Sequence, residues 1–353
     1  MEPIKASGYF LSEFNKPLEK RDFVIDQVAD DEVVVKVAGC GLCHTDITFY
    51  TGQVTPKHEM PLILGHEISG TVVATGSMGQ GWMGKSVIVP AVLPCGECEL
   101  CKNERDNICQ KQLMPGNDFH GGFATHLKVP FRVLCETPEN LGDFKLPQLS
   151  VIADAITTPY QSLKRSKLKK GDLAVVIGVG GIGIYMVQHA KIAGATVIAV
   201  DVDDKKLAAA QEQGADYIFS AKGKSEKDLK NEIRETVKAN KLPRYFWKVF
   251  ETSGTGAGQQ TAFSLLSFGG TLAIVGFTME KAPVRLSNLM AFDAEMFGNW
   301  GCRPQYYTNV VEDVLSKKIK LLENIQEYPL DDINKVIGLA LEHKLEKRAI
   351  FVP

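Results

Sequence analysis

The sequence predicts an α/β protein of two domains, one rich in short β-strands and one built on a doubly wound parallel sheet. Length is the first observation, because 353 residues exceed what one hydrophobic core usually serves. The second is a change of pattern near residue 155, where segments rich in glycine and proline give way to alternating apolar strands and helices. The third is composition, since 44% hydrophobic and 23% charged residues are typical of a globular protein.

Residues 1–154 form the part with β-strand patterns. The β-branched runs at 32–38 and 85–92 predict strands, and the glycine and proline between them indicate irregular loops. Residues 155–300 alternate strand and helix, which indicates βαβ units and a parallel sheet. We expect strands at 175–179, 196–202, 217–220, 247–253 and 271–277, and helices at 182–193, 205–213, 225–240 and around 259–267.

Residues 301–353 are expected to return to the first domain. They contain amphipathic stretches at 306–316 and 333–342 and a terminal strand at 349–353.

Charge and hydropathy limit the classes of partner. The formal net charge of -2 gives no electrostatic reason to expect a nucleic acid or an anionic membrane, so a small-molecule partner is expected. The stretch from Met1 to Lys20 lacks the apolar core of a signal peptide, and no run approaches the length of a membrane span. We therefore expect a cytoplasmic protein whose eight cysteines are thiols or metal ligands rather than disulfides.

Four cysteines follow one another at C-x2-C-x2-C-x7-C spacing: Cys95, Cys98, Cys101 and Cys109. Four thiolates can surround one tetrahedral zinc ion and leave no position for water or substrate, which predicts a structural site. An iron–sulfur cluster uses the same ligands and remains an alternative, as do four free thiols.

A second set of metal-binding side chains lies in two short loops flanked by glycine. Cys43 is found in GCGLCHTD, and His66 and Glu67 are found in LGHEISG. A catalytic zinc ion needs three protein ligands and one open position, which such a set can supply. The alternative for His66 is a partly buried histidine with a structural role.

A glycine motif indicates a dinucleotide site. Gly178, Gly180, Gly181 and Gly183 lie between a predicted strand and a predicted helix, where glycine lets a pyrophosphate approach the helix N-terminus. Asp201 ends the next predicted strand, where a carboxylate can accept hydrogen bonds from the adenosine ribose and repel a 2′-phosphate. The pattern predicts NAD in preference to NADP.

The motifs GCGLCHTD, LGHEISG, the cysteine quartet and GVGGIG occur in the order and at the spacing of zinc-dependent medium-chain alcohol dehydrogenases. The chain resembles this family over essentially its whole length. The resemblance implies a GroES-like catalytic domain at 1–154, a Rossmann NAD-binding domain at 155–300 and a tail at 301–353 that returns to the first domain. It also implies NAD and two zinc ions per chain as cofactors, and a homo-oligomer, either a dimer or a tetramer.

The resemblance assigns roles around the catalytic zinc ion. It makes Cys43 and His66 ligands, with Asp154 as the third ligand, a position that is cysteine in some members and aspartate in others. Glu67 matches a glutamate that can approach the metal, and Asp46 matches a carboxylate that orients the ligand histidine.

Proton transfer is assigned in the same way. Thr45 matches the hydroxyl group that takes the alcohol proton, although a helix-capping threonine is the alternative. Thr48 occupies a position where many members carry a relay histidine, so we expect a shortened or rerouted relay.

On the cofactor side, the resemblance places Lys206 beside the adenosine ribose, and His44 and Arg348 near the pyrophosphate. The alternative is that these three are solvated surface charges. The resemblance places Val275, Gly276 and Phe277 beside the nicotinamide, with residues 298–300 in a similar role.

The segments 113–126 and 87–98, with GHEISG, resemble a narrower family, the 6-hydroxycyclohex-1-ene-1-carbonyl-CoA dehydrogenases. This resemblance implies oxidation of a ring alcohol of a CoA thioester to the conjugated ketone. Residues near the substrate would be Val92, Leu93, Met114 and Phe123, unless they are plain core residues. The basic run at 164–170 could meet the CoA phosphates, although a solvated face is the more common reason for such a run.

Three other functions remain open. They are a zinc dehydrogenase of simple alcohols or polyols, a metal-free enone reductase on the same scaffold, and a non-catalytic NAD-binding redox sensor.

Overall fold

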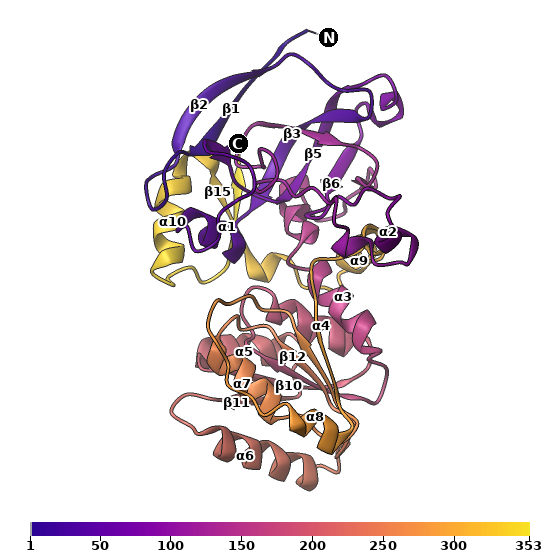
Figure 1. The fold of residues 1–353 in the computed structure, drawn as a ribbon, viewed down its shortest axis with the longest axis vertical. Coiled ribbons are helices and arrows are strands. Elements are labelled where there is room, and N and C mark those ends of the chain that lie inside the picture. The colour runs from indigo at the N-terminus through magenta and orange to yellow at the C-terminus, as the bar shows by residue number, and fades with distance from the viewer. Residues whose placement is uncertain (1) are drawn as a thin grey trace. The chain divides into compact units, whose positions relative to one another are not determined.

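The computed structural model describes residues 2–353, which divide into two compact units (Figure 1). The first unit comprises the chain up to Thr157, Gly301–Lys317 and Leu321–Pro353. The second unit comprises Thr158–Trp300 and Lys318–Lys320. No helix within residues 2–353 is long and apolar enough to cross a membrane.

The first unit is built on two β-sheets. One has seven strands in the order β15-β16-β3-β5-β6-β8, with β7 also paired to β3, and the other has three in the order β2-β1-β4. Their bounds are β1 (Ile4–Leu11), β2 (Glu19–Ile25), β3 (Glu32–Gly41), β4 (Leu62–Ile63), β5 (Glu67–Thr75), β6 (Ser86–Val89), β7 (His126–Pro130), β8 (Cys135–Glu136), β15 (Ile325–Pro329) and β16 (Arg348–Val352).

Short helices connect these strands and cover them. They are α1 (His44–Tyr50), α2 (Glu99–Lys102), α9 (Tyr307–Leu315), α10 (Ile333–Leu341) and the 3-10 helices η1 (Gln80–Trp82), η2 (Asp106–Ile108), η3 (Leu146–Ala153), η4 (Pro304–Tyr306), η5 (Leu322–Asn324) and η6 (Leu330–Asp332).

The second unit is a six-stranded parallel sheet in the order β11-β10-β9-β12-β13-β14. This order places the first strand of the unit beside the fourth, at the switch point where open parallel sheets bind ligands. The strands are β9 (Leu173–Ile177), β10 (Thr196–Asp201), β11 (Tyr217–Ser220), β12 (Lys248–Glu251), β13 (Thr271–Ile274) and β14 (Glu295–Gly298). The helices are α3 (Thr157–Ser166), α4 (Gly183–Ile192), α5 (Asp204–Glu212), α6 (Glu226–Ala239), α7 (Gly256–Ser264) and α8 (Ser287–Phe292).

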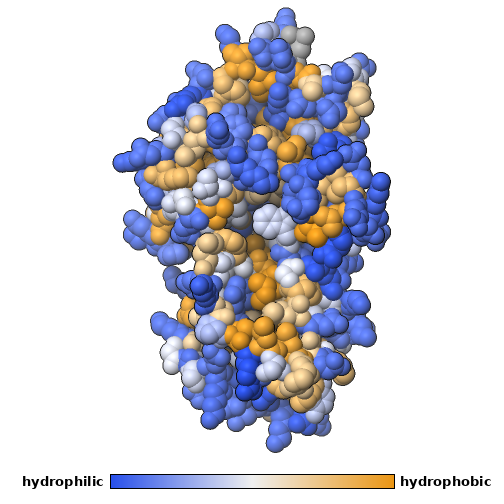
Figure 2. Space-filling view, viewed as in Figure 1, coloured by the Kyte–Doolittle hydropathy of each residue, from blue (hydrophilic) through white to orange (hydrophobic). Residues whose placement is uncertain are grey.

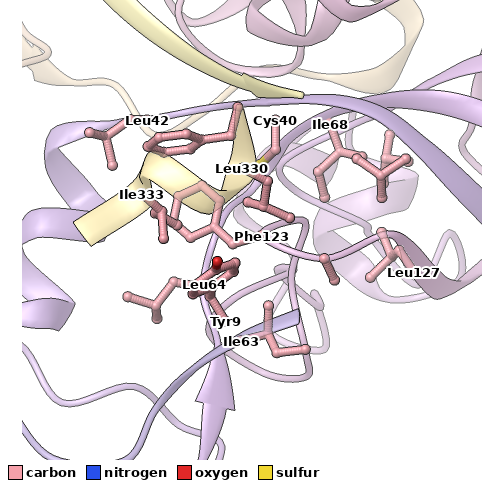
Figure 3. Close-up of a cluster of buried hydrophobic side chains, with 14 of the residues drawn as sticks. Tyr9, Cys40, Leu42, Ile63, Leu64, Ile68, Phe123, Leu127, Leu330 and Ile333 are labelled. Atoms are coloured by element: carbon pink, nitrogen blue, oxygen red, sulfur yellow. The ribbon is translucent and has the colours of Figure 1, made fainter. Parts of the chain in front are cut away.

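Each unit has its own hydrophobic core. In the second unit, β9 is buried along its whole length because helices cover both faces of a parallel sheet. Hydrophilic side chains cover much of the surface in Figure 2, with hydrophobic side chains in patches that include the region of α8. In the first unit, Figure 3 shows Tyr9, Leu64 and Phe123 packed with Leu330 and Ile333 of the C-terminal segment. The tail therefore completes the core of the unit that contains the N-terminal strands.

The two kinds of sheet confirm the predicted fold class, a β-rich domain joined to a Rossmann-type doubly wound sheet. Three of the four helices predicted in the second unit, α4, α5 and α6, begin and end within one residue of the predicted bounds, whereas α3 and α8 were not predicted. The exception is α7, which begins at Gly256 rather than near Gln259. Thr255 explains the earlier start, because its Oγ1 accepts a 2.9 Å hydrogen bond from the Gly258 amide and caps the helix.

Candidate active site

Four metal-binding side chains predicted from separate segments come together in the first unit. Ligand atoms of Cys43, His66, Glu67 and Asp154 all lie within 4.8 Å of one another. The Oδ2 atom of Asp154 lies 3.7 Å from Cys43 Sγ and 3.7 Å from His66 Nε2. Ligands around a tetrahedral zinc ion lie about 3.3–3.8 Å apart, given its usual bond lengths. Cys43, His66 and Asp154 therefore fit a zinc ion.

Strand pairing brings these segments together. Cys43 follows the end of β3, and Glu67 begins β5, immediately after His66. The two strands pair antiparallel with Gly41 opposite Glu67, so the loop of Cys43 meets the loop of His66 at one end of the ladder. A Cβ atom at Gly41 would lie 2.1 Å from Glu67 Oε2, so only glycine leaves room for this carboxylate. Asp154 comes from the turn that ends η3.

Asp46 fixes the orientation of the predicted ligand histidine. His66 Nδ1 donates to Asp46 Oδ1 at 3.2 Å, which leaves Nε2 directed toward Asp154. Asp46 also accepts hydrogen bonds from the amides of Cys43 at 2.9 Å and Gly65 at 3.1 Å. Burial alone would lower the pKa of His66, but the Asp46 and Asp154 carboxylates raise it well above its ordinary value. The carboxylates of Asp46 and Asp154 therefore give the buried surroundings of His66 an excess of negative charge, which is suited to binding a cation.

Glu67 differs from the other three because it already has a cationic partner. Its Oε1 atom accepts hydrogen bonds from Arg348 Nη1 at 2.7 Å and from the Ala155 amide at 3.2 Å. Burial raises the pKa of Glu67 to about 7, although Arg348 opposes the shift. Its buried Oε2 atom has no hydrogen-bond partner within residues 2–353. Glu67 therefore lies beside Cys43, His66 and Asp154, and its hydrogen bond to Arg348 restrains it from approaching a metal ion there.

The two threonines of α1 have different surroundings. Thr45 is half-buried, and its Oγ1 atom lies 3.8 Å from Cys43 Sγ, at the edge of the metal-binding group. Thr48 is buried and donates its hydroxyl group to the Thr45 carbonyl at 2.8 Å. The Thr48 hydroxyl group therefore holds the backbone of the helix.

The cysteine quartet forms a second candidate metal site in the first unit. The Sγ atoms of Cys98 and Cys101 lie 3.5 Å apart, those of Cys95 and Cys101 3.9 Å, those of Cys98 and Cys109 3.7 Å, and those of Cys95 and Cys109 3.5 Å. A tetrahedron of sulfur atoms around zinc has edges of about 3.8 Å. All four cysteines are free thiols in the structure, so the lobe fits one zinc ion closed to substrate.

The glycine turn of the second unit connects β9 to α4, as predicted. Gly178 has a φ of +83°, and a Cβ atom there would lie 2.4 Å from the Ser253 Cα atom. A Cβ atom on Gly183 would lie 1.8 Å from the Gly178 carbonyl oxygen, so the turn closes tightly on itself. Asp201 at the end of β10 contributes to the turn, because its Oδ2 atom accepts a 2.8 Å hydrogen bond from the Val179 amide.

Asp201 also organises the loop that follows it. Its Oδ1 atom accepts hydrogen bonds from the amides of Val202 at 2.7 Å and Asp203 at 3.0 Å. A carboxylate has about four acceptor positions, so capacity remains for a further donor. An open pocket of about 580 Å³ adjoins this loop and is lined by Val202, Asp203, Asp204, Lys205 and Lys222.

The other predicted cofactor residues divide between the units. Lys206 lies over the turn, with its Nζ atom 3.9 Å from the position of a Cβ on Gly180. In the second unit, Val275 follows β13, and Phe277 is about half exposed. His44 and Arg348 belong to the first unit, so their roles toward a cofactor stay predictions.

The sequence analysis did not assign a functional role to the end of β12 and the residues that follow it. In the structure, hydrogen bonds connect this segment to the glycine turn and to the loop after β13. Thr252 Oγ1 donates to the Gly178 carbonyl at 2.6 Å. The backbone carbonyl of the fully buried Glu251 accepts from the amides of Val275 at 2.9 Å and Gly276 at 3.0 Å. The motif ETSGT at the end of a predicted strand could have indicated this segment. Its contacts, however, depend on the strand order, which places β12 between β9 and β13.

Residues considered for the substrate pocket lie in the core of the first unit. Leu93 and Phe123 are fully buried, and Met114 joins them in the same cluster. The ring of Phe123 packs edge-on against Phe351 at 5.3 Å. This placement favours the core interpretation for these side chains. Val92 is also buried.

Comparisons with known proteins agree with this geometry. Residues 29–139 match the family model of the alcohol dehydrogenase GroES-like domain, and residues 181–316 match that of the zinc-binding dehydrogenases. An alcohol dehydrogenase of Geobacillus stearothermophilus is 27% identical over 96% of this chain and 97% of its own length. The alcohol dehydrogenase of Aeropyrum pernix has a similar structure, with a TM-score of 0.88 and 27% identity over 98% of this chain and 100% of that chain.

A zinc-type alcohol dehydrogenase-like protein of Haemophilus influenzae, itself uncharacterised, is 32% identical over 75% of this chain and 74% of its own length. Together with the two domain matches, this similarity shows the family. The chain belongs to the zinc-type medium-chain alcohol dehydrogenase family, which confirms the predicted enzyme class, that of the NAD-dependent zinc alcohol dehydrogenases.

Proposed function

We propose that the protein oxidises a secondary alcohol to a ketone, with hydride transfer to NAD, at a zinc ion held by Cys43, His66 and Asp154. The observation that carries the proposal is the convergence of three different donor side chains at the spacing of zinc ligands. Three protein ligands leave a fourth position for the substrate oxygen. When bound there, zinc acts as a Lewis acid that lowers the pKa of the alcohol.

The protein side chains supply charge balance, orientation and proton transfer. A thiolate at Cys43 and a carboxylate at Asp154 neutralise a divalent cation, and Asp46 keeps the His66 ring in the ligating orientation. The hydroxyl group of Thr45 adjoins the metal-binding group and would take the alcohol proton. Thr48 does not extend this path, because its hydroxyl group is bonded to the Thr45 carbonyl.

We propose that Asp201 selects NAD over NADP. Its carboxylate ends β10 beside the glycine turn, and its negative charge would repel a phosphate on the ribose 2′ position. The remaining acceptor positions would bind the ribose hydroxyl groups of NAD.

For the substrate, we propose the narrower assignment to 6-hydroxycyclohex-1-ene-1-carbonyl-CoA, which would be oxidised to the conjugated ketone. Its support is the resemblance of the segments 87–98 and 113–126 to dehydrogenases of this CoA thioester. The second candidate is a simple alcohol or polyol, which needs the same zinc site and a differently shaped pocket.

The test mixes purified protein with NAD and the CoA thioester and follows NADH absorbance, with cyclohexanol, cyclohex-2-enol and NADP as controls. NADH formation that depends on the CoA thioester supports the narrow assignment. Activity on the free alcohols alone keeps the zinc dehydrogenase and removes the CoA thioester.

Metal analysis tests the site itself. The proposal expects two zinc ions and no iron per chain, with one zinc ion lost in Cys43→Ser and His66→Ala, which should abolish turnover and leave NAD binding largely intact. A single zinc ion bound by the cysteine quartet would instead favour the metal-free enone reductase. Tight NAD binding without turnover of any substrate would favour the redox sensor.

We also propose that the protein is a homo-oligomer. The edge strand β14 pairs with β13, and within residues 2–353 its other edge has no strand partner. Nearby Leu286, Met290 and Met296 are 60%, 78% and 41% exposed. Exposed edges with apolar neighbours are commonly covered by another chain. Light scattering coupled to size exclusion would show a dimer or tetramer, and a monomer would refute the proposal.

A further inference from the structure

A buried hydroxyl group lies directly behind the turn that carries Asp154. Tyr307, the first residue of α9, is fully buried, and its Oη donates a 2.5 Å hydrogen bond to the Ala153 carbonyl oxygen. Ala153 precedes Asp154 in the chain and ends η3. Any movement of the Ala153 carbonyl would rotate the peptide that leads into Asp154.

The same hydroxyl group connects to the other side of the turn. Tyr307 is hydrogen-bonded to the side chain of Thr157 and to the backbone of Ala91. Thr157 is fully buried, and its Oγ1 atom lies 3.4 Å from the Asp154 carbonyl oxygen, so its single hydroxyl proton is shared between that oxygen and the Oη atom of Tyr307. The turn from Ala153 to Thr157 is therefore held at both ends by one small hydrogen-bond network.

The backbone conformation at Asp154 does not by itself fix the direction of the carboxylate. Asp154 has φ -143° and ψ -59°, values outside those of a continuing helix. Helical hydrogen bonds therefore do not determine the direction of its side chain. Contacts from elsewhere in the unit must hold the carboxylate 3.7 Å from both Cys43 Sγ and His66 Nε2.

The segment that carries Tyr307 is itself anchored to the four-cysteine lobe. Asp106 is buried in η2, between Cys101 and Cys109, and accepts hydrogen bonds from Arg303 Nε at 2.8 Å and Gln305 Nε2 at 2.6 Å. Because each carboxylate oxygen of Asp106 accepts one of these hydrogen bonds, the start of the segment 303–307 is held against the four-cysteine lobe. The lobe thus has a route to the Asp154 turn that does not pass through the main sheet.

We propose that Tyr307 is a positioning residue that holds Asp154 in the ligand set of the catalytic metal, with the Asp106–Arg303 pair anchoring it to the four-cysteine lobe. The inference rests on the proposed role of Asp154 as a ligand. Tyr307 is not one of the candidate ligands and acts through the peptide of Ala153.

The test variant is Tyr307→Phe, which keeps the ring and removes only the hydroxyl group. Loss of a partner that orients a metal ligand typically weakens metal binding about 10- to 100-fold. We expect this loss at one of the two metal sites. Zinc retained per chain is measured after timed dialysis against a graded series of chelator concentrations, with thermal unfolding and NAD binding followed in parallel.

Two further variants complete the design. Tyr9→Phe is the matched control, because Tyr9 is a buried tyrosine of the same unit whose hydroxyl group donates to Asp331 at 2.8 Å. Asp154→Ala is the reference for loss of the ligand itself. We expect Tyr307→Phe to release one zinc ion at chelator concentrations at which Tyr9→Phe retains two. We also expect added zinc to restore the turnover of Tyr307→Phe.

The outcomes separate the inference from the proposed function. If Asp154→Ala retains both zinc ions as the wild type does, the ligand assignment fails and the inference fails with it. If Asp154→Ala loses one zinc ion and Tyr307→Phe retains both, only the positioning role is overturned. Release of both zinc ions from Tyr307→Phe would also overturn it. Should Tyr307→Phe not fold, Thr157→Val is measured in its place, with selective release supporting the inference and wild-type retention refuting it.

Discussion

Arg348 donates a 2.7 Å hydrogen bond from Nη1 to Oε1 of Glu67, and both side chains are buried, with exposures of 7% and 0%. Arg348 begins β16, and Glu67 begins β5. The last strand of the chain therefore supplies the counter-charge for a carboxylate beside the metal-binding group. This pair also restrains Glu67, which the sequence suggested as a residue able to approach the metal.

Arg348→Met should strongly destabilise the first unit. Breaking a buried ion pair leaves an uncompensated charge, which typically costs about 3–5 kcal/mol. The double variant Glu67→Gln with Arg348→Met should recover part of this loss, because no charge remains buried without its partner. Denaturant unfolding at a fixed zinc concentration measures both effects.

The control for that measurement is Lys20→Met, which breaks an ion pair with Asp331 whose side chains are 51% and 70% exposed. An exposed pair contributes little, so the unfolding midpoint should hardly move. If Arg348→Met behaves like Lys20→Met, the buried pair does not contribute to stability as argued.

Asp46→Asn should weaken zinc binding at the catalytic site. Asp46 accepts three hydrogen bonds, from His66 Nδ1 and from the amides of Cys43 and Gly65. An asparagine amide group would oppose one of these donors. We expect zinc affinity and kcat/KM to fall about 10- to 100-fold, as is typical for residues that orient a ligand histidine.

Chelator competition and steady-state kinetics would measure the effect of Asp46→Asn, with NAD binding as the internal control. NAD affinity should stay at the wild-type value, since Asp46 and the glycine turn belong to different units. Unchanged zinc affinity together with unchanged kcat/KM would remove Asp46 from its assigned role.

The fold of the second unit was largely predictable from sequence, because parallel strands buried on both faces leave continuous apolar runs. The bounds of α4, α5 and α6 each differ from the predicted bounds by one residue at either end. β2 was not predicted, since the first four of its seven residues are exposed and carry no alternating pattern. Its place in the sheet comes from pairing with β1, a long-range contact that no local pattern encodes.

The metal-binding groups were predictable for a different reason. The cysteine quartet lies within one short segment, and Cys43 and His66 lie in motifs with recognisable neighbours. Tyr307 and Asp106 were not predictable, because a buried tyrosine in an amphipathic helix and an acid in a loop have ordinary local patterns. Their partners lie more than 150 positions away along the chain, and only the folded first unit brings them together.

Asp201→Ala should weaken NAD binding and relax discrimination against NADP. The variant removes a charged acceptor from the ribose and from the Val179 amide. Hydrogen bonds to charged groups contribute about 1.5–3 kcal/mol, which corresponds to about 10- to 100-fold in Kd for NAD. Asp201→Asn keeps an acceptor oxygen, so it should bind NAD better than Asp201→Ala while still admitting NADP. An unchanged ratio of kcat/KM values for NAD and NADP would contradict the assignment.

His120 should make the stability of the first unit depend on pH. Its ring packs edge-on against Phe10 at 5.3 Å and lies 5.1 Å from the ring of His58. Burial, and then the charge of His58, lower the pKa of His120 below its ordinary value of 6.5. The unfolded chain therefore takes up a proton at a higher pH than the folded protein does. The stability that neutral His120 provides is fully present above about pH 6.5 and is lost as the pH falls through its folded value.

His120→Phe keeps an aromatic ring at this position and cannot titrate, so the unfolding free energy should fall less steeply between about pH 7 and pH 5. Some slope should remain, because burial also lowers the pKa values of His44 and His126. The comparison at about pH 8, where His120 is neutral in both states, isolates the packing cost and the lost hydrogen bond from the Ile63 amide. Denaturant titrations across this range decide the matter, since an equal slope in variant and wild type would show that His120 does not contribute to the acid sensitivity of the fold.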